Sequence, residues 1–188
     1  MLFEIHLTVQ NIGILKFIDD CKEFGLKPIL IEIENNSIIV EQLMTSFKDE
    51  RYHYFPSLVK QRNFLLSLGY TILREKVEIK PGLKKHSEHT YYESHLRLKL
   101  PKNFNRTILE LFSQKNDLHL SKNLFKRDEF FDFQMITYRK NDMDIDSFIN
   151  QIEKFKNDLD RLNIIYDKIE IEECVYDSNI SVDNSWLK

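Results

Sequence analysis

The stretch FEIHLTV, residues 3–9, alternates apolar and polar side chains. Because successive side chains of a strand point to opposite faces, this period predicts a strand with one face made for a core. The other face presents a carboxylate, an imidazole and a hydroxyl, from Glu4, His6 and Thr8. The fold around this strand decides whether that polar face is only solvated or forms part of a site.

The composition is that of an ordinary globular protein. Of 188 residues, 42% are hydrophobic, and 27 basic against 30 acidic side chains give a formal charge of −3. This balance provides no global basic field for nucleic acid. Cys21 and Cys174 lack metal or redox spacing, and no stretch has the form of a signal peptide or a membrane span. We therefore expect a cytoplasmic protein with reduced cysteines and no membrane partner.

The first half of the chain reads as strand, helix, strand, strand, helix, strand. Gly25 ends the first helix, and the pair Asn35-Asn36 predicts the tight turn of a hairpin. The expected strands are 2–9, 27–34, the stretch SIIVEQLM after the turn and YTILREKVEI, and the expected helices are 12–24 and 55–68.

The same order begins again after a loop. The expected strands are 91–100, 117–121, 131–139 and 164–173, and the expected helices are 104–115 and 145–162. The sequence therefore predicts an α+β fold of duplicated ferredoxin-like βαββαβ units, with mostly antiparallel sheets and the helices on one face. The predicted organisation is a first half at 1–80, a connecting loop at 81–90, a second half at 91–175 and a tail at 176–188.

Matching residues support the duplication. FEIHL pairs with YESHL, EQLMTS with FQMITY, and REKVEI with YDKIEI, at offsets of 89 to 92 residues. Two halves of similar composition can also match by chance, but the order and offset favour a repeat. A pseudo-twofold arrangement would bring matched residues together across a shared cleft. The pairs are Glu4 with Glu93, His6 with His95, Gln42 with Gln134, Thr45 with Thr137, Lys76 with Lys168 and Glu78 with Glu170.

The predicted face without helices carries the chemistry. His6 and His95 are acid or base candidates, since a neighbouring carboxylate orients an imidazole and raises its basicity. Cationic side chains there suit an anionic ligand, and carboxylates suit a divalent metal. Alternating charges also occur on a solvated sheet face. The predicted ligand-binding residues include Arg74, Lys76, Arg97 and Lys168, and the predicted metal ligands are Glu4, Glu78, Glu93 and Glu170.

HLTV at 6–9 and HLSK at 119–122 resemble the paired His-x-Thr/Ser motifs of the two-histidine phosphoesterases. The resemblance implies a duplicated two-lobed α/β protein that cleaves phosphodiesters. It assigns acid and base roles to His6 and His119 and phosphate binding to Thr8 and Ser121. The internal repeat instead pairs His6 with His95.

IEIEN, KVEIK and KIEIE are similar to the Glu-x-Glu-x-Lys signature of the triphosphate tunnel hydrolases. In that family eight strands line a cavity with alternating Glu, Lys and Arg around a metal and a triphosphate. The family signature stands near the start of the chain, where this sequence has FEIHLTV.

The leading hypothesis is a hydrolase or transferase acting on a phosphorylated small molecule or nucleotide in a cleft between the halves, with a divalent metal as an optional cofactor. One alternative is a non-catalytic interaction module whose charged sheets pair in a homo-oligomer or bind a partner. A second alternative is a metal-dependent triphosphate hydrolase of tunnel type.

Overall fold

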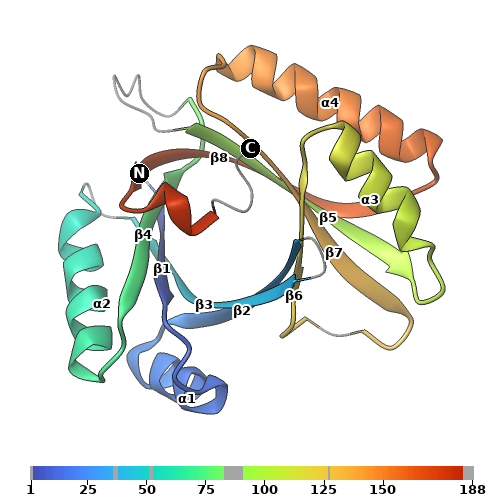
Figure 1. The fold of residues 1–188 in the computed structure, drawn as a ribbon. Coiled ribbons are helices and arrows are strands. Elements are labelled where there is room, and N and C mark those ends of the chain that lie inside the picture. The colour runs from blue at the N-terminus through green and yellow to red at the C-terminus, as the bar shows by residue number, and fades with distance from the viewer. Residues whose placement is uncertain (1, 36–37, 51–52, 83–90, 127, 184–188) are drawn as a thin grey trace.

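The computed structural model describes residues 2–35, 38–50, 53–82, 91–126 and 128–183. The order of helices and strands is the predicted one (Figure 1). The elements are β1 (Phe3–Val9), α1 (Ile14–Phe24), β2 (Lys27–Asn35), β3 (Ile38–Asp49), α2 (Phe55–Ser67), β4 (Ile72–Ile79), β5 (Tyr91–Pro101), α3 (Arg106–Lys115), β6 (His119–Asn123), β7 (Phe131–Lys140), α4 (Ile145–Arg161), β8 (Ile165–Asp177) and the short 3-10 helix η1 (Ile180–Asp183).

The predicted fold class is wrong in its central feature, because the strands form one closed barrel. The strand order is β1-β3-β2-β6-β7-β5-β8-β4, with β4 returning to β1, and all the neighbouring strands are antiparallel. The two seams between the halves are the β2–β6 pair and the β4–β8 pair. Two separate sheets would each leave two edge strands with unpaired backbone groups, and closure pairs those edges.

The apolar cores lie outside the barrel, between the strands and the helices that surround it (Figure 1). In the first half, Ile5, Leu7 and Val77 pack with residues of α1 and α2, including Phe17 and Leu65. A second core joins the strands of the other half to α3 and α4. The apolar side chains of the alternating strands therefore face outward, and the polar side chains face the barrel interior.

Local signals explain how the helices end and begin. Gly25 follows α1 with a φ of 71°, the left-handed conformation that glycine adopts at little steric cost. Asn105 and Asp144 cap α3 and α4 by accepting hydrogen bonds from the backbone N–H groups of Thr107 and Ser147. These caps hold the helices at the positions that the sequence predicts.

The hairpin strand β3 is longer than expected, because it continues through Asp49. β3 pairs with β1 from Leu43 to Asp49, so residues 45–49, which follow the expected strand SIIVEQLM, also belong to the strand. This extension carries the side chains of Ser46 and Lys48 into the barrel.

None of the helices in the described part of the chain has both the length and the apolar character of a membrane span.

Candidate functional site

The barrel encloses a cavity of about 570 Å³ that receives side chains from every strand. Residues of the two halves therefore share one cavity, which lies inside a single barrel and not between two separate sheets. The predicted site residues that line the cavity are Glu4, His6, Thr8, Arg74, Lys76, Glu78, Glu93, His95, Arg97, Ser121, Lys168 and Glu170.

His119 is the predicted site residue that the cavity lining does not include. It lies at the start of β6, opposite Thr137 of β7. The structure therefore does not bring His119 to the cavity beside His6, as the two-histidine phosphoesterase resemblance implies.

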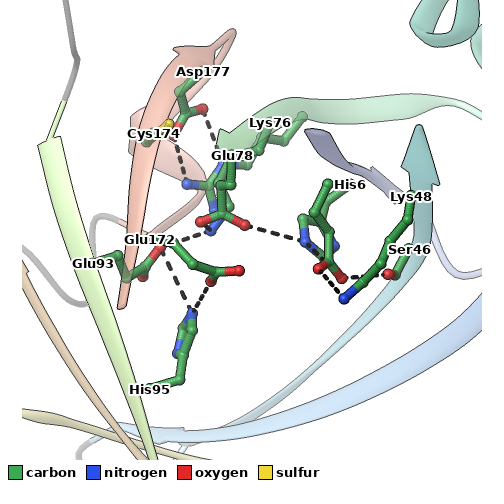
Figure 2. Close-up of polar contacts among 12 residues, drawn as sticks. His6, Ser46, Lys48, Lys76, Glu78, Glu93, His95, Glu172, Cys174 and Asp177 are labelled. Atoms are coloured by element: carbon green, nitrogen blue, oxygen red, sulfur yellow. Dashed lines mark hydrogen bonds and ion pairs between the residues drawn. The ribbon is translucent and has the colours of Figure 1, made fainter. Parts of the chain in front are cut away.

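Lys76 joins the charged groups of the two halves (Figure 2). Its Nζ lies 2.7 Å from Glu78 Oε1 and 2.7 Å from Glu93 Oε2. Glu93 also accepts a 2.8 Å hydrogen bond from Nη2 of Arg139 at Oε1. Burial alone would lower the pKa of Lys76, but Glu78 and Glu93 outweigh it and raise the pKa above its usual value. The ammonium group therefore stays charged inside the barrel.

The two buried carboxylates stay ionised for the corresponding reason. Each side chain is only 1% exposed. Burial would raise the pKa of Glu78, but Lys76 and His6 outweigh it and lower the pKa to about 2. Arg139 and Lys76 likewise overcome the effect of burial on Glu93 and hold its pKa well below the usual range.

His6 lies between two carboxylates. Its Nε2 is 3.1 Å from Glu78 Oε2 and 3.7 Å from Glu4 Oε1. Glu4 is itself fixed by a 2.6 Å hydrogen bond from Ser46 Oγ and by Lys48 Nζ at 3.2 Å. Within the described part of the chain, the buried His6 Nδ1 has no hydrogen-bond partner.

His95 has a different environment. Its Nδ1 lies 3.0 Å from the Thr137 hydroxyl oxygen, and its Nε2 lies 3.6 Å from Glu172 Oε2 and 3.9 Å from Glu93 Oε2. Burial lowers the pKa of His95, so the imidazole is neutral near pH 7. Burial and then the nearby Glu78 raise the pKa of Glu172 to about 9, so this carboxyl carries a proton at that pH. A neutral imidazole and a protonated carboxyl therefore face each other.

Three of these side chains offer a metal-binding group. One ligand atom from each of Glu78, Glu93 and His95 lies within 4.8 Å of the others. Two carboxylate oxygens and an imidazole nitrogen suit a divalent cation such as Mn²⁺ or Zn²⁺. The other two predicted metal ligands, Glu4 and Glu170, do not belong to this group.

The repeat register explains why Glu172 was missed. Glu78 of β4 is opposite Glu4 of β1, whereas Glu172 of β8 is opposite Glu93 of β5. Lys76 is opposite His6 and Glu170 is opposite His95, so the counterpart of Lys76 in the second half is Glu170. The predicted matches of Lys76 with Lys168 and Glu78 with Glu170 are therefore wrong by two residues.

The predicted match between β3 and β7 is displaced by one residue from the match that the structure gives. Ser46 is opposite His6, and Thr137 is opposite His95, so Ser46 and not Thr45 is the counterpart of Thr137. Five charged residues of the lining were also not predicted to belong to the site: Lys27, Lys48, Lys126, Arg139 and Glu172. All of them except Lys126 stand two residues from another lining residue on the same strand, and that period of two could have indicated them.

Two predicted anion-binding arginines already have carboxylate partners. Arg74 donates to both oxygens of Asp177, at 3.0 and 2.6 Å, and also to the Tyr91 hydroxyl. This group is buried, and it ties the end of β8 to β4. Arg97 makes a corresponding two-bond contact with Asp167, at 2.6 and 2.9 Å, in a more exposed position.

More basic than acidic side chains line the cavity, although the whole chain is acidic. Eight lysine and arginine side chains and five glutamates line it. All five glutamates come from β5, β8, β4 and β1, which are consecutive neighbours in the barrel. We call the lining residues of these four strands the carboxylate wall. The lining residues of the other four strands, β3, β2, β6 and β7, include no carboxylate, and we call these residues together with Lys126 the carboxylate-free wall.

No family model matches the chain, and no curated protein matches it either. Among solved structures, a protein from Fusobacterium nucleatum subsp. nucleatum provisionally named a monooxygenase is 10% identical with a TM-score of 0.37, over 95% of this chain and 94% of that one. The small subunit of acetolactate synthase from Thermotoga maritima is 13% identical with a TM-score of 0.33, over 93% and 95% of the two chains. At these scores the likeness carries no argument about function.

Proposed function

We propose that the barrel binds a phosphorylated small molecule in its interior and hydrolyses a phosphoester or phosphoanhydride bond. The observation that carries this proposal is the lining of eight cations, five glutamates and two histidines in a chain whose formal charge is −3. A cavity of about 570 Å³ is also of the size that holds a nucleotide-sized ligand.

The cations supply the binding energy in this proposal. Lys76 and Arg139 lie at the centre of the carboxylate cluster, where charge-assisted hydrogen bonds to phosphate oxygens are strengthened by the low local dielectric. The same groups would stabilise the charge that develops on a transferred phosphoryl group.

His95 and Glu172 supply the proton transfers. Neutral His95 takes a proton from the attacking water as its oxygen bonds to phosphorus, and protonated Glu172 gives a proton to the leaving oxygen as the P–O bond breaks. The products are inorganic phosphate or a shorter phosphate compound and the released alcohol or phosphate. His6, held by Glu78 and Glu4, is the second candidate base.

Glu78, Glu93 and His95 fit a divalent metal by donor type and spacing. A bound metal would polarise a phosphoryl oxygen, and because it would occupy a nitrogen lone pair of His95, His6 would then be the base. Lys76 contacts both Glu78 and Glu93 in the present arrangement, so metal binding requires its ammonium to move from between them. Displaced in this way, Lys76 remains on the carboxylate wall and can contact a phosphate oxygen.

The closed barrel favours the tunnel-type alternative over the two-lobed one. Eight strands surround a cavity lined by Glu, Lys and Arg, which is the layout that the tunnel-hydrolase resemblance implies. The interaction-module alternative needs flat charged faces for a partner. Here the charged faces of the strands point into the barrel, so their polar side chains support ligand binding instead.

Release of phosphate from p-nitrophenyl phosphate, inorganic tripolyphosphate and ATP tests the proposal, with Mg²⁺, Mn²⁺ or a chelator present. His95→Gln should lower the rate by about 10²- to 10⁴-fold, the usual contribution of general acid–base catalysis. His53→Gln is the matched control, since His53 is exposed and does not line the cavity. Absence of both turnover and binding with every phosphate compound would refute the proposal.

A further inference from the structure

The carboxylate-free wall carries apolar side chains that neither core uses. Five of them line the cavity: Ile29 and Ile31 of β2, Met44 of β3, and Phe133 and Met135 of β7. All five are half-buried, and none belongs to the core on either side of the barrel. We call these five residues the apolar platform.

The platform is out of place in a cavity built only for inorganic anions. Apolar surface that faces water in an open cavity lowers stability, whereas the same surface covered by an apolar ligand contributes to binding. Small-molecule sites typically combine apolar walls with a few polar groups that orient the ligand. Among the lining residues of the same wall, Gln42 and Gln134 carry amides that can both donate and accept hydrogen bonds.

Lys126 lies at one end of this platform. Its Nζ lies 4.1 Å from the centre of the Phe133 ring, and Arg97 Cζ lies 5.6 Å from the same ring. Within the part of the chain that the structure describes, no carboxylate lies within ion-pair distance of Lys126. Burial lowers the pKa of Lys126, and Arg97 and Lys168 lower it further against the opposing effect of Asp167 and Asp128.

We propose that the ligand is an organic phosphate whose flat apolar group lies on the apolar platform, while its phosphate chain reaches the two buried cations Lys76 and Arg139. This inference rests on the proposed function and specifies its substrate class: a phosphate ester or anhydride with a ring of nucleobase size, rather than an inorganic polyphosphate. The platform gives specificity for the organic group, and Lys126 binds an anionic group next to it.

Calorimetric titration with ATP, UTP and inorganic tripolyphosphate tests the substrate class, because the three probes share a triphosphate chain. The nucleotides should bind at least ten times more tightly than tripolyphosphate. Met135→Gln should weaken nucleotide binding at least fivefold and leave tripolyphosphate binding within a factor of two. Lys126→Gln should weaken the binding of all three.

Matched variants separate the platform from general effects of substitution. Met135→Leu keeps an apolar side chain and should bind nucleotides as the wild type does. Leu15→Gln changes an apolar residue that is 79% exposed on α1 and should change nothing. Thermal unfolding of each variant checks that the barrel is intact.

Two results distinguish the failure of this inference from that of the proposed function. If tripolyphosphate binds as tightly as both nucleotides, or if Met135→Gln weakens all three probes equally, the platform does not select an organic group and the proposed hydrolase stands. If no phosphate compound binds or is hydrolysed, the proposed function fails and this inference fails with it.

Discussion

Replacing Glu93 by glutamine should strongly destabilise the barrel. The carboxylate is 1% exposed and contacts two cations, Lys76 at 2.7 Å and Arg139 at 2.8 Å. Glutamine keeps the size of the side chain and one acceptor oxygen, but it removes the charge that both cations share. Arg139 is only 6% exposed, so its charge cannot turn to solvent in the native state.

The magnitude follows from the burial of the pair. Removing one partner of a buried ion pair leaves an uncompensated charge and lowers the free energy of unfolding by about 3–5 kcal/mol. Glu78 still neutralises Lys76, so we expect the lower end, about 3 kcal/mol. For a domain of this size each kcal/mol lowers the melting temperature by about 2–4 °C, which predicts a drop of roughly 6–12 °C.

Urea unfolding and thermal melting followed by circular dichroism measure this loss. Glu153→Gln is the control, because Glu153 is 55% exposed on α4 and pairs with Lys156 on the same helix. Its effect should be below about 0.5 kcal/mol. If Glu93→Gln is no more destabilising than Glu153→Gln, the charge cluster does not stabilise the fold and the reasoning is wrong.

Three further predictions concern stability and reactivity. The pKa of Glu78 is lowered to about 2, so its contribution to the free energy of unfolding should be lost as the pH falls from about 4.5 to about 2. In urea unfolding, the stability of Glu78→Gln should therefore depend less on pH in this acid range than that of the wild type. Equal pH curves for the two proteins would contradict this. Burial raises the pKa of Cys21 to about 12 and that of Cys174 to about 11, so a chromogenic disulfide reagent should react with both only after unfolding, and rapid reaction of the native protein would disprove it. Gly25→Ala should lower the free energy of unfolding by about 1–2 kcal/mol, since Gly25 has a φ of 71°, and an unchanged urea midpoint would show that the turn relaxes.

The alternation of polar and apolar side chains along the strands predicted several of the residues that line the cavity together. Glu4, His6 and Thr8 alternate with core residues, and the same period places Glu93, His95 and Arg97 on the matching face of β5. Because side-chain direction depends only on position along the strand, these predictions needed no knowledge of the fold.

Register and closure could not be predicted in this way. A strand that slips by two residues keeps every side chain on the same face, so the repeated charges of KIEIE fit opposite β5 in more than one register. The sequence match therefore selected Glu170 where the structure places Glu172 opposite Glu93. The seams β2–β6 and β4–β8 join edges far apart in sequence, and backbone pairing between edges leaves no periodic signal.

The two seams have a consequence for how the pocket could diversify. Each seam joins one strand from each half, so the barrel has the topology of two half-barrels assembled edge to edge. Two identical half-barrels would have to repeat every interior residue. A single chain is free of that constraint, and here Thr8 and Arg97 are counterparts, as are Lys76 and Glu170. Covalent linkage of the two halves thus permits an asymmetric interior, in which a ligand has one preferred orientation instead of two equivalent ones.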